Sequence, residues 1–313
     1  MIREKRAKRE GTMLLMDTKN CLDVLKEWLA GAIDMHVHAA PDCASRKYTD
    51  AELARQYHQA GMGGFVSKCH HADTSGRAAV IRELMPLQEA GIVYGSVVLN
   101  HSVGGLNPSA VITCGRTGGK VVWFPTVDAA NDAIYKRKHR NPALGQCNEQ
   151  PSGREKITIL AEDGSLRPEV YLVLEALRQQ DLVLATGHLA PQESLVLIRE
   201  AAAMGIQKLL VTHVSLPITK ADAGLQQDFL DAGAWLEHCF YTPYYQLASW
   251  DEILASIHLA GSEHIILSTD FGQCQSPDPA EGLRQFAQEL YRRGISGQEI
   301  RQMMVENPRG LLA

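Results

Sequence analysis

The segment GAIDMHVHAAPD, residues 31–42, joins a short apolar run to two histidines one residue apart. In a β-strand alternate side chains point to the same face, so His36 and His38 would lie on one side of the sheet, about 7 Å apart along the chain. Two imidazoles in this arrangement either bind one metal ion or are buried histidines that hydrogen-bond within the core. The choice depends on whether other strands end in metal-binding residues.

Seven further apolar or β-branched runs follow, separated by longer helical stretches. The eight runs cover residues 31–38, 63–70, 92–100, 120–128, 181–188, 207–214, 234–240 and 264–270. Several are almost continuously hydrophobic, which is typical of a parallel sheet covered on both faces. Eight strand–helix units predict an α/β protein with a (β/α)₈ TIM barrel; a doubly wound open sheet is the alternative, because a count of strands does not show closure.

The chain length of 313 residues fits one such barrel with insertions. Residues 1–20, which start with a basic stretch, predict a flexible N-terminal arm, and residues 21–313 predict a single barrel domain. The clearest insertion is residues 129–168, after the fourth strand, and its second half predicts a hairpin around Asp163 and Gly164. A connection this long is typical of a lid over a functional site or of a disordered segment.

Composition narrows the classes of partner. The formal net charge of −5 gives no reason to expect nucleic acid or an anionic membrane as a partner. No apolar run reaches the roughly 20 residues that span a bilayer, and no signal-peptide pattern is present. Seven cysteines without a CxxC pair argue against a disulfide framework and a structural zinc knuckle. We expect a cytoplasmic protein that acts on a small molecule, and a homo-oligomer is compatible with these features.

Metal-binding or acid–base side chains stand at the ends of most predicted strands. In chain order they are His36, His38, Lys68, His70, His188, His213, His238 and Asp270. Catalytic groups of (β/α)₈ barrels gather at the carboxyl ends of the strands, and histidines scattered at random in a core would not repeat this position. Imidazole nitrogen and carboxylate oxygen together suit zinc or another divalent first-row ion.

In this ordered set the sequence resembles the amidohydrolase superfamily of metal-dependent hydrolases. That pattern has a DxHxH-type segment on strand one, single histidines ending strands five and six, and an aspartate ending strand eight. The matching segments here are DMHVH (34–38), ATGH (185–188), VTH (211–213) and STD (268–270), and the resemblance spans about residues 31–310. It implies that His36, His38, His188 and Asp270 bind a metal ion. It also implies that His213 binds a second ion or contacts substrate and water.

The resemblance implies hydrolysis of a small-molecule amide, cyclic amide, lactone or similar bond by a metal-activated water. Asp270 would bind the ion and also carry a proton from water to the leaving group. His213, His238 or Lys68 would stabilise the developing oxyanion. The expected ion is Zn²⁺, with Mn²⁺, Fe²⁺ or Ni²⁺ as alternatives.

One element departs from the superfamily's pattern. Two-metal members usually carry a lysine carbamate or a glutamate at the end of strand four, where this sequence has Asp128; its conspicuous lysine, Lys68, is on strand two. We therefore expect one ion rather than two, and a positively charged, uncarboxylated Lys68. For His238, a hydrogen-bonded core histidine is the alternative interpretation.

Two other functions fit parts of the pattern. A metal-dependent phosphoesterase of the histidinol-phosphatase type also begins with HxH on a related barrel. It normally ends with Asp-x-His, however, and the segment TDFGQ (269–273) has no such histidine. The second alternative is a protein that binds metal without turnover, which the full ligand set with its retained Asp270 disfavours.

Overall fold

The computed structural model describes residues 29–86, 90–139 and 155–313 of the chain. Eight parallel strands follow one another through the sheet in sequence order. Each overlaps one of the eight predicted runs. Their bounds are β1 Ile33–His38, β2 Gly64–Lys68, β3 Ile92–Val98, β4 Gly119–Trp123, β5 Val183–Ala185, β6 Leu209–Val211, β7 Trp235–Cys239 and β8 Ile265–Ser268.

Backbone contacts between β1 and the segment after β8 close the sheet. The amide of Asp270 donates to the carbonyl of His36 at 2.8 Å, and the amide of His38 donates to the carbonyl of Phe271 at 2.8 Å. Val37 and Phe271 also form a parallel bridge. The (β/α)₈ barrel is therefore confirmed, and the open doubly wound sheet is excluded.

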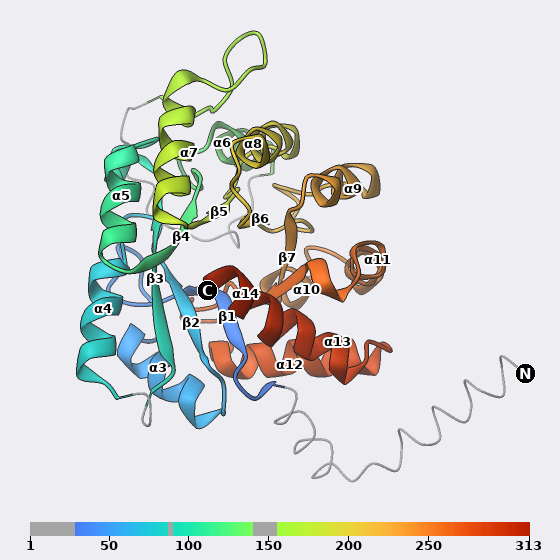
Figure 1. The fold of residues 1–313 in the computed structure, drawn as a ribbon. Helices are drawn as coiled ribbons and strands as arrows, with labels where there is room; N and C mark the ends of the chain where they lie inside the picture. Colours follow the sequence, from blue (N-terminus) through green and yellow to red (C-terminus); the bar gives the residue numbers. More distant parts are fainter. Residues whose placement is uncertain (1–28, 87–89, 140–154) are drawn as a thin grey trace, which may run out of the picture.

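Helices form an outer layer around the strands (Figure 1). Capping boxes start α3, α11 and α13, where Thr49, Ser249 and Ser296 accept from the backbone amides three residues on. The helices are α3 Asp50–Gln59, α4 Ser75–Leu84, α5 Pro108–Arg116, α6 Ala130–Lys138, α7 Pro168–Gln180, α8 Pro191–Ala203, α9 Ala223–Asp231, α10 Tyr241–Tyr244, α11 Trp250–Ala260, α12 Pro279–Arg292, α13 Gly297–Arg301 and α14 Asn307–Leu312. Among the described residues, no helix is long and apolar enough to cross a membrane.

The barrel has an apolar interior that is separate from the larger core between strands and helices. Trp123 of β4 is its largest member, and Leu311 and Leu312 of α14 belong to it as well. The Asn307 side chain donates to the carbonyl of Ile265, the first residue of β8, so α14 lies at the amino ends of the strands. Because that end is packed, polar side chains converge at the opposite, carboxyl end.

The insertion after β4 begins with α6. Its later part contains the predicted hairpin: Leu160 and Leu166 form an antiparallel bridge, and Gly164 at the turn has φ of 83°. Residues 140–154 lie outside the described residues, as does the expected N-terminal arm at residues 1–20. The role of the insertion as a lid stays a prediction.

Candidate active site

An irregularity in β1 brings its two histidines into the barrel. The register of β1 against β2 shifts between Asp34 and Val37, as in a β-bulge. Met35 consequently packs in the interior core, and the His36 ring lies next to Trp123 with ring centres 5.5 Å apart. His38 lies on the same side, with its ring centre 5.7 Å from that of His36. The prediction that these two histidines share a face is confirmed.

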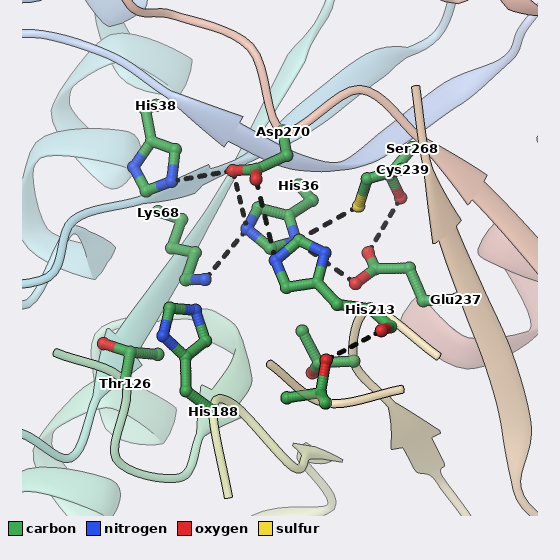
Figure 2. Close-up of polar contacts among 12 residues, drawn as sticks. His36, His38, Lys68, Thr126, His188, His213, Glu237, Cys239, Ser268 and Asp270 are labelled. Carbon is green, nitrogen blue, oxygen red and sulfur yellow. Dashed lines mark hydrogen bonds and ion pairs between the residues drawn. The ribbon is translucent and has the colours of Figure 1, made fainter. Parts of the chain in front are cut away.

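Three histidine side chains meet the carboxylate of Asp270, the second residue after β8 (Figure 2). The Nε2 atoms of His38 and His36 lie 3.1 Å and 3.3 Å from Asp270 Oδ1, and His213 Nε2 lies 3.6 Å from Asp270 Oδ2. These three histidines are almost completely buried. The structure thus brings together four of the five predicted metal-binding residues.

The backbone is strained at two members of this cluster. His213 and Asp270 both have φ of 55°, the left-handed region that residues with a side chain rarely adopt. Such a conformation costs about 1–3 kcal/mol and persists only where the surroundings hold it. Here Thr219 donates to the carbonyl of His213, and the side chain of Gln273 donates to the carbonyl of Asp270. The fold therefore holds both side chains against a local preference.

His188, the remaining predicted ligand, lies on the same cavity but outside the tight group. Its ring centre is 5.9 Å from that of His213. Its Nδ1 bonds Asp132 Oδ1 at 2.9 Å, so Nε2 is the nitrogen left for a ligand. Asp132 lies on α6, inside the insertion, and the sequence reasoning missed it because no strand-end pattern marks it.

Glu237 is the other functional candidate that sequence reasoning missed. Its carboxylate accepts from His36 Nδ1 at 3.2 Å and from the Ser268 hydroxyl at 2.9 Å (Figure 2). With a proton on Nδ1, His36 keeps an unprotonated Nε2 on the side of Asp270. Carboxylates that orient metal-binding histidines through the distal nitrogen are common around metal sites. Glu237 therefore supports the cluster from within the barrel.

Lys68 ends β2 and is fully buried beside the cluster. Its Nζ lies 2.8 Å from His36 Nε2 and 5.0 Å from the ring centre of Trp123. Burial lowers the pKa of Lys68, while the charges of Asp270 and Glu237 oppose that effect. An ion held by His36 Nε2 would replace the hydrogen bond from Lys68.

Two residues that the sequence analysis singled out, His238 and Asp128, lie away from the cluster. His238 faces the helices: its Nδ1 bonds Ser215 at 3.0 Å and its Nε2 bonds Ser256 of α11 at 2.8 Å. This matches the alternative interpretation of a hydrogen-bonded core histidine. Asp128, five residues past the end of β4, accepts from the His101 amide and pairs with Lys156. The described part of β4 therefore supplies no anionic bridge for a second ion.

The histidines of the cluster are suited to bind a cation. Burial lowers the pKa of His36 and His38 well below the usual value, and the charges of Lys68 and Arg46 respectively add to the effect. Burial also lowers the pKa of His213 to about 3, against the opposing charge of Asp270. All three imidazoles are therefore neutral at pH 7, the form in which nitrogen donates to a metal.

The donor set fits a divalent ion. Two bonds of about 2.1 Å at a tetrahedral angle place their ligand atoms roughly 3.4 Å apart, and the contacts of His36, His38 and Asp270 span 3.1–3.3 Å. A second buried group includes Glu237 and Cys239. Burial raises the pKa of Cys239 well above its usual value, so its thiol stays protonated, and Glu237 already accepts two hydrogen bonds. Glu237 and Cys239 therefore surround His36 and do not form a separate metal site.

Solved hydrolases share this fold at low sequence identity. The probable dipeptidase PvdM from Pseudomonas aeruginosa superimposes with a TM-score of 0.63 at 11% identity, covering 93% of this chain and 96% of that one. An amidohydrolase from Pseudomonas aeruginosa gives 0.57 at 13%, covering 93% and 97%. Organophosphorus hydrolase from Deinococcus radiodurans gives 0.52 at 14%, covering 91% and 93%. The match in fold to amidohydrolase superfamily members, which the sequence pattern implied, is confirmed.

We also compared the sequence with protein-family models and with proteins of curated function. No protein of curated function matches the sequence. The model of a family of unknown function, DUF6282, matches residues 31–237, from the strand that carries His36 and His38 to the strand that carries Glu237. The chain therefore belongs to the DUF6282 family.

Proposed function

We propose that this protein is a metal-dependent hydrolase that cleaves a small-molecule amide, cyclic amide, lactone or similar bond. The observation that carries the proposal is the convergence of three neutral, buried histidines on the carboxylate of Asp270 at the carboxyl end of the barrel. His36, His38 and Asp270 would hold the ion, and His188 would complete the set. Zn²⁺ is the proposed ion, because imidazole and carboxylate donors suit it.

When bound, the ion supplies positive charge that lowers the pKa of water and polarises the bond to be cleaved. Asp270 accepts the proton of the attacking water and passes it to the leaving group. Its side chain is 13% exposed, whereas that of His36 is inaccessible, so the carboxylate reaches the cavity. Lys68 and His213 lie beside it, where their N–H groups stabilise negative charge on the substrate oxygen.

An open cavity favours turnover over storage of metal. Structural metal sites are closed by protein ligands, whereas catalytic sites keep a position for water or substrate. Here His38, His188, His213 and Asp270 all line one cavity that opens to solvent. This arrangement supports the hydrolase over the non-catalytic metal-binding protein.

The test combines metal analysis with a substrate screen. We expect the purified protein to contain a divalent metal and to hydrolyse members of a panel of amides, cyclic amides, lactones and phosphoesters. Chelation should abolish the activity, and Zn²⁺, Mn²⁺, Fe²⁺ or Ni²⁺ should restore it to different extents. His38→Ala should lose both metal and activity, whereas His258→Ala, on the exposed side of α11, should lose neither.

The same screen separates the alternatives. Activity confined to phosphoesters would favour the phosphoesterase. Bound metal without turnover of any class would favour the non-catalytic metal-binding protein. A purified protein that neither contains nor takes up metal would refute the proposed function.

A further inference from the structure

Arg46 lies on the wall of the cavity above the Asp270 cluster. Its side chain is only 4% exposed, and its Nε donates to Asp42 Oδ2 at 2.7 Å. Within residues 29–86, 90–139 and 155–313, Asp42 is the one polar group that the Arg46 side chain bonds. The two terminal nitrogens of the guanidinium are thus left with no protein acceptor among the described residues.

The loop around Arg46 is held against the loop that carries Asp270. Arg46 forms an antiparallel bridge with Gln273, and the amide of Lys47 donates to the carbonyl of Gly272 at 2.9 Å. Asp42, whose side chain is inaccessible to solvent, anchors the guanidinium at Nε. Both the backbone and the charged end of Arg46 are therefore placed before any ligand arrives, which lowers the entropic cost of binding one.

The other cations on this cavity have partners at their charged ends, whereas Arg46 is paired with Asp42 through Nε. Lys136 pairs with Asp132 at 2.8 Å, and Lys68 contacts His36. The end of a guanidinium can donate two parallel hydrogen bonds to one carboxylate. A phosphate can form the same pair of hydrogen bonds, but it carries a second charge that the Arg46 guanidinium, already paired with Asp42, does not balance. A carboxylate is therefore the anion that this wall fits.

Apolar side chains also line this cavity. Leu216, Pro217 and Ile218, which follow β6, line it together with Val127 and Leu247. A molecule in the cavity could therefore contact both Arg46 and apolar side chains.

We infer that Arg46 binds a carboxylate of the substrate, so the substrate is a small carboxylic acid with an apolar body. This inference rests on the proposed function, because it assumes that the bound acid is the substrate. Binding of a carboxylate by Arg46 can nevertheless be measured without turnover.

The test measures binding and not turnover. Three acids, N-acetyl-L-leucine, hexanoate and 3-phenylpropionate, are titrated into the purified protein by calorimetry, each beside its uncharged amide. We expect each acid to bind roughly tenfold or more tightly than its amide, as a charge-assisted pair of hydrogen bonds provides. Arg46→Gln should reduce this ratio to about one. Arg199→Gln, an exposed arginine on α8 that pairs with Asp228, should leave it unchanged.

Arg46→Lys keeps the charge but loses the planar fork, so the ratio should fall severalfold. This variant decides the question if Arg46→Gln fails to fold. An unchanged ratio in a folded Arg46 variant would overturn the inference. So would wild-type protein that binds acids and amides equally, or that binds no acid below about 10 mM, the weakest affinity expected of such a pair.

The outcomes separate this inference from the proposed function. A carboxylate bound by a metal ion alone would not depend on Arg46, so an effect of Arg46→Gln isolates the guanidinium. Acid binding that needs Arg46, in a protein without hydrolytic activity, would refute the proposed function and leave the carboxylate site standing. Metal-dependent hydrolysis with an acid preference that ignores Arg46 would refute the carboxylate site alone.

Discussion

Glu237 and His238 are neighbours on β7 and are equally buried, yet they belong to different regions of the molecule. Glu237 faces the barrel interior and orients His36. His238 faces the helical layer, where Ser215 and Ser256 satisfy both of its ring nitrogens. Burial at the carboxyl end of a strand therefore does not identify a functional residue; the face of the strand does.

The two environments also differ in how complete their hydrogen bonding is. Around His238 the network continues from Ser256 to Gln226 at 2.6 Å, which ties β7 to α11 and α9. On the inner face, by contrast, the Nδ1 atoms of His38 and His213 have no hydrogen-bond partner among the described residues. A completed network indicates a structural role; on the inner face the Nε2 atoms of His38 and His213 point instead at Asp270, where an ion would bind.

The largest effect is expected for Asp270 on the inner face. Asp270→Asn should lower turnover by about 10³-fold or more, because an amide cannot accept the proton of water at neutral pH. Metal content should fall much less, since the amide oxygen still coordinates. Metal analysis and steady-state kinetics with a substrate from the screen measure the two effects, with the exposed Asp251→Asn as the control. Near-normal turnover in a metal-loaded Asp270→Asn would rule out the proton-transfer role.

Lys68 tests whether the inner face holds one ion or two. If Lys68 is a cation that stabilises the substrate oxygen, Lys68→Met should reduce turnover about 10²-fold and leave the metal content near one ion per chain. The exposed Lys220→Met is the control. Two ions per wild-type chain that are lost together in Lys68→Met would instead show that Lys68 is a carbamate bridge.

Substitution of Glu237 should weaken metal binding more than it lowers the free energy of unfolding. Glu237→Gln replaces the carboxylate with a neutral amide, whose oxygen accepts more weakly from His36 Nδ1 and whose NH₂ group can donate to it instead, so the imidazole can carry its proton on Nε2, where it cannot bind metal. We expect metal affinity to fall about 10- to 100-fold, the usual effect of removing a carboxylate behind a metal-binding histidine. Competition with a fluorescent chelator measures it. Affinity equal to wild type would exclude this role for Glu237.

His238 should have the smallest effect on activity and a clear effect on stability. His238→Gln should change turnover less than about threefold, while unfolding free energy falls by about 1–3 kcal/mol through the lost buried hydrogen bonds. Kinetics and urea unfolding measure the two. A loss of turnover comparable to that of Lys68→Met would place His238 in the site after all.

The stability change at His238 should depend on pH. Burial lowers the pKa of His238 to about 4 from an ordinary value of 6.5. Between these values the unfolded chain binds a proton that the folded chain does not, so stability is complete above pH 6.5 and declines as the pH falls to 4. The loss is about 3 kcal/mol over this range. Wild type and His238→Gln should therefore converge in stability as the pH is lowered, whereas exposed His258→Gln should follow wild type.

Much of the fold follows from local sequence. Strands buried on both faces read as apolar runs, and helices between them carry readable caps, so all eight strands and three capping boxes were predictable. The residues that follow the apolar runs must lie at one end of a parallel barrel, so the sequence also placed His36, His38, His188, His213 and Asp270 on the same end.

Only the tertiary structure shows which face of its strand each of these side chains occupies and which residues hydrogen-bond to it. When both faces of a strand are buried, no alternation of polar and apolar residues sets the face, and a shift of one residue exchanges them. Glu237 rather than His238 therefore enters the barrel, and the irregularity in β1 turns His36 inward. Asp132 comes from α6 and Arg46 from the loop after β1, and the approach of both to the site depends on contacts between segments far apart in the chain, such as the bridge of Arg46 with Gln273.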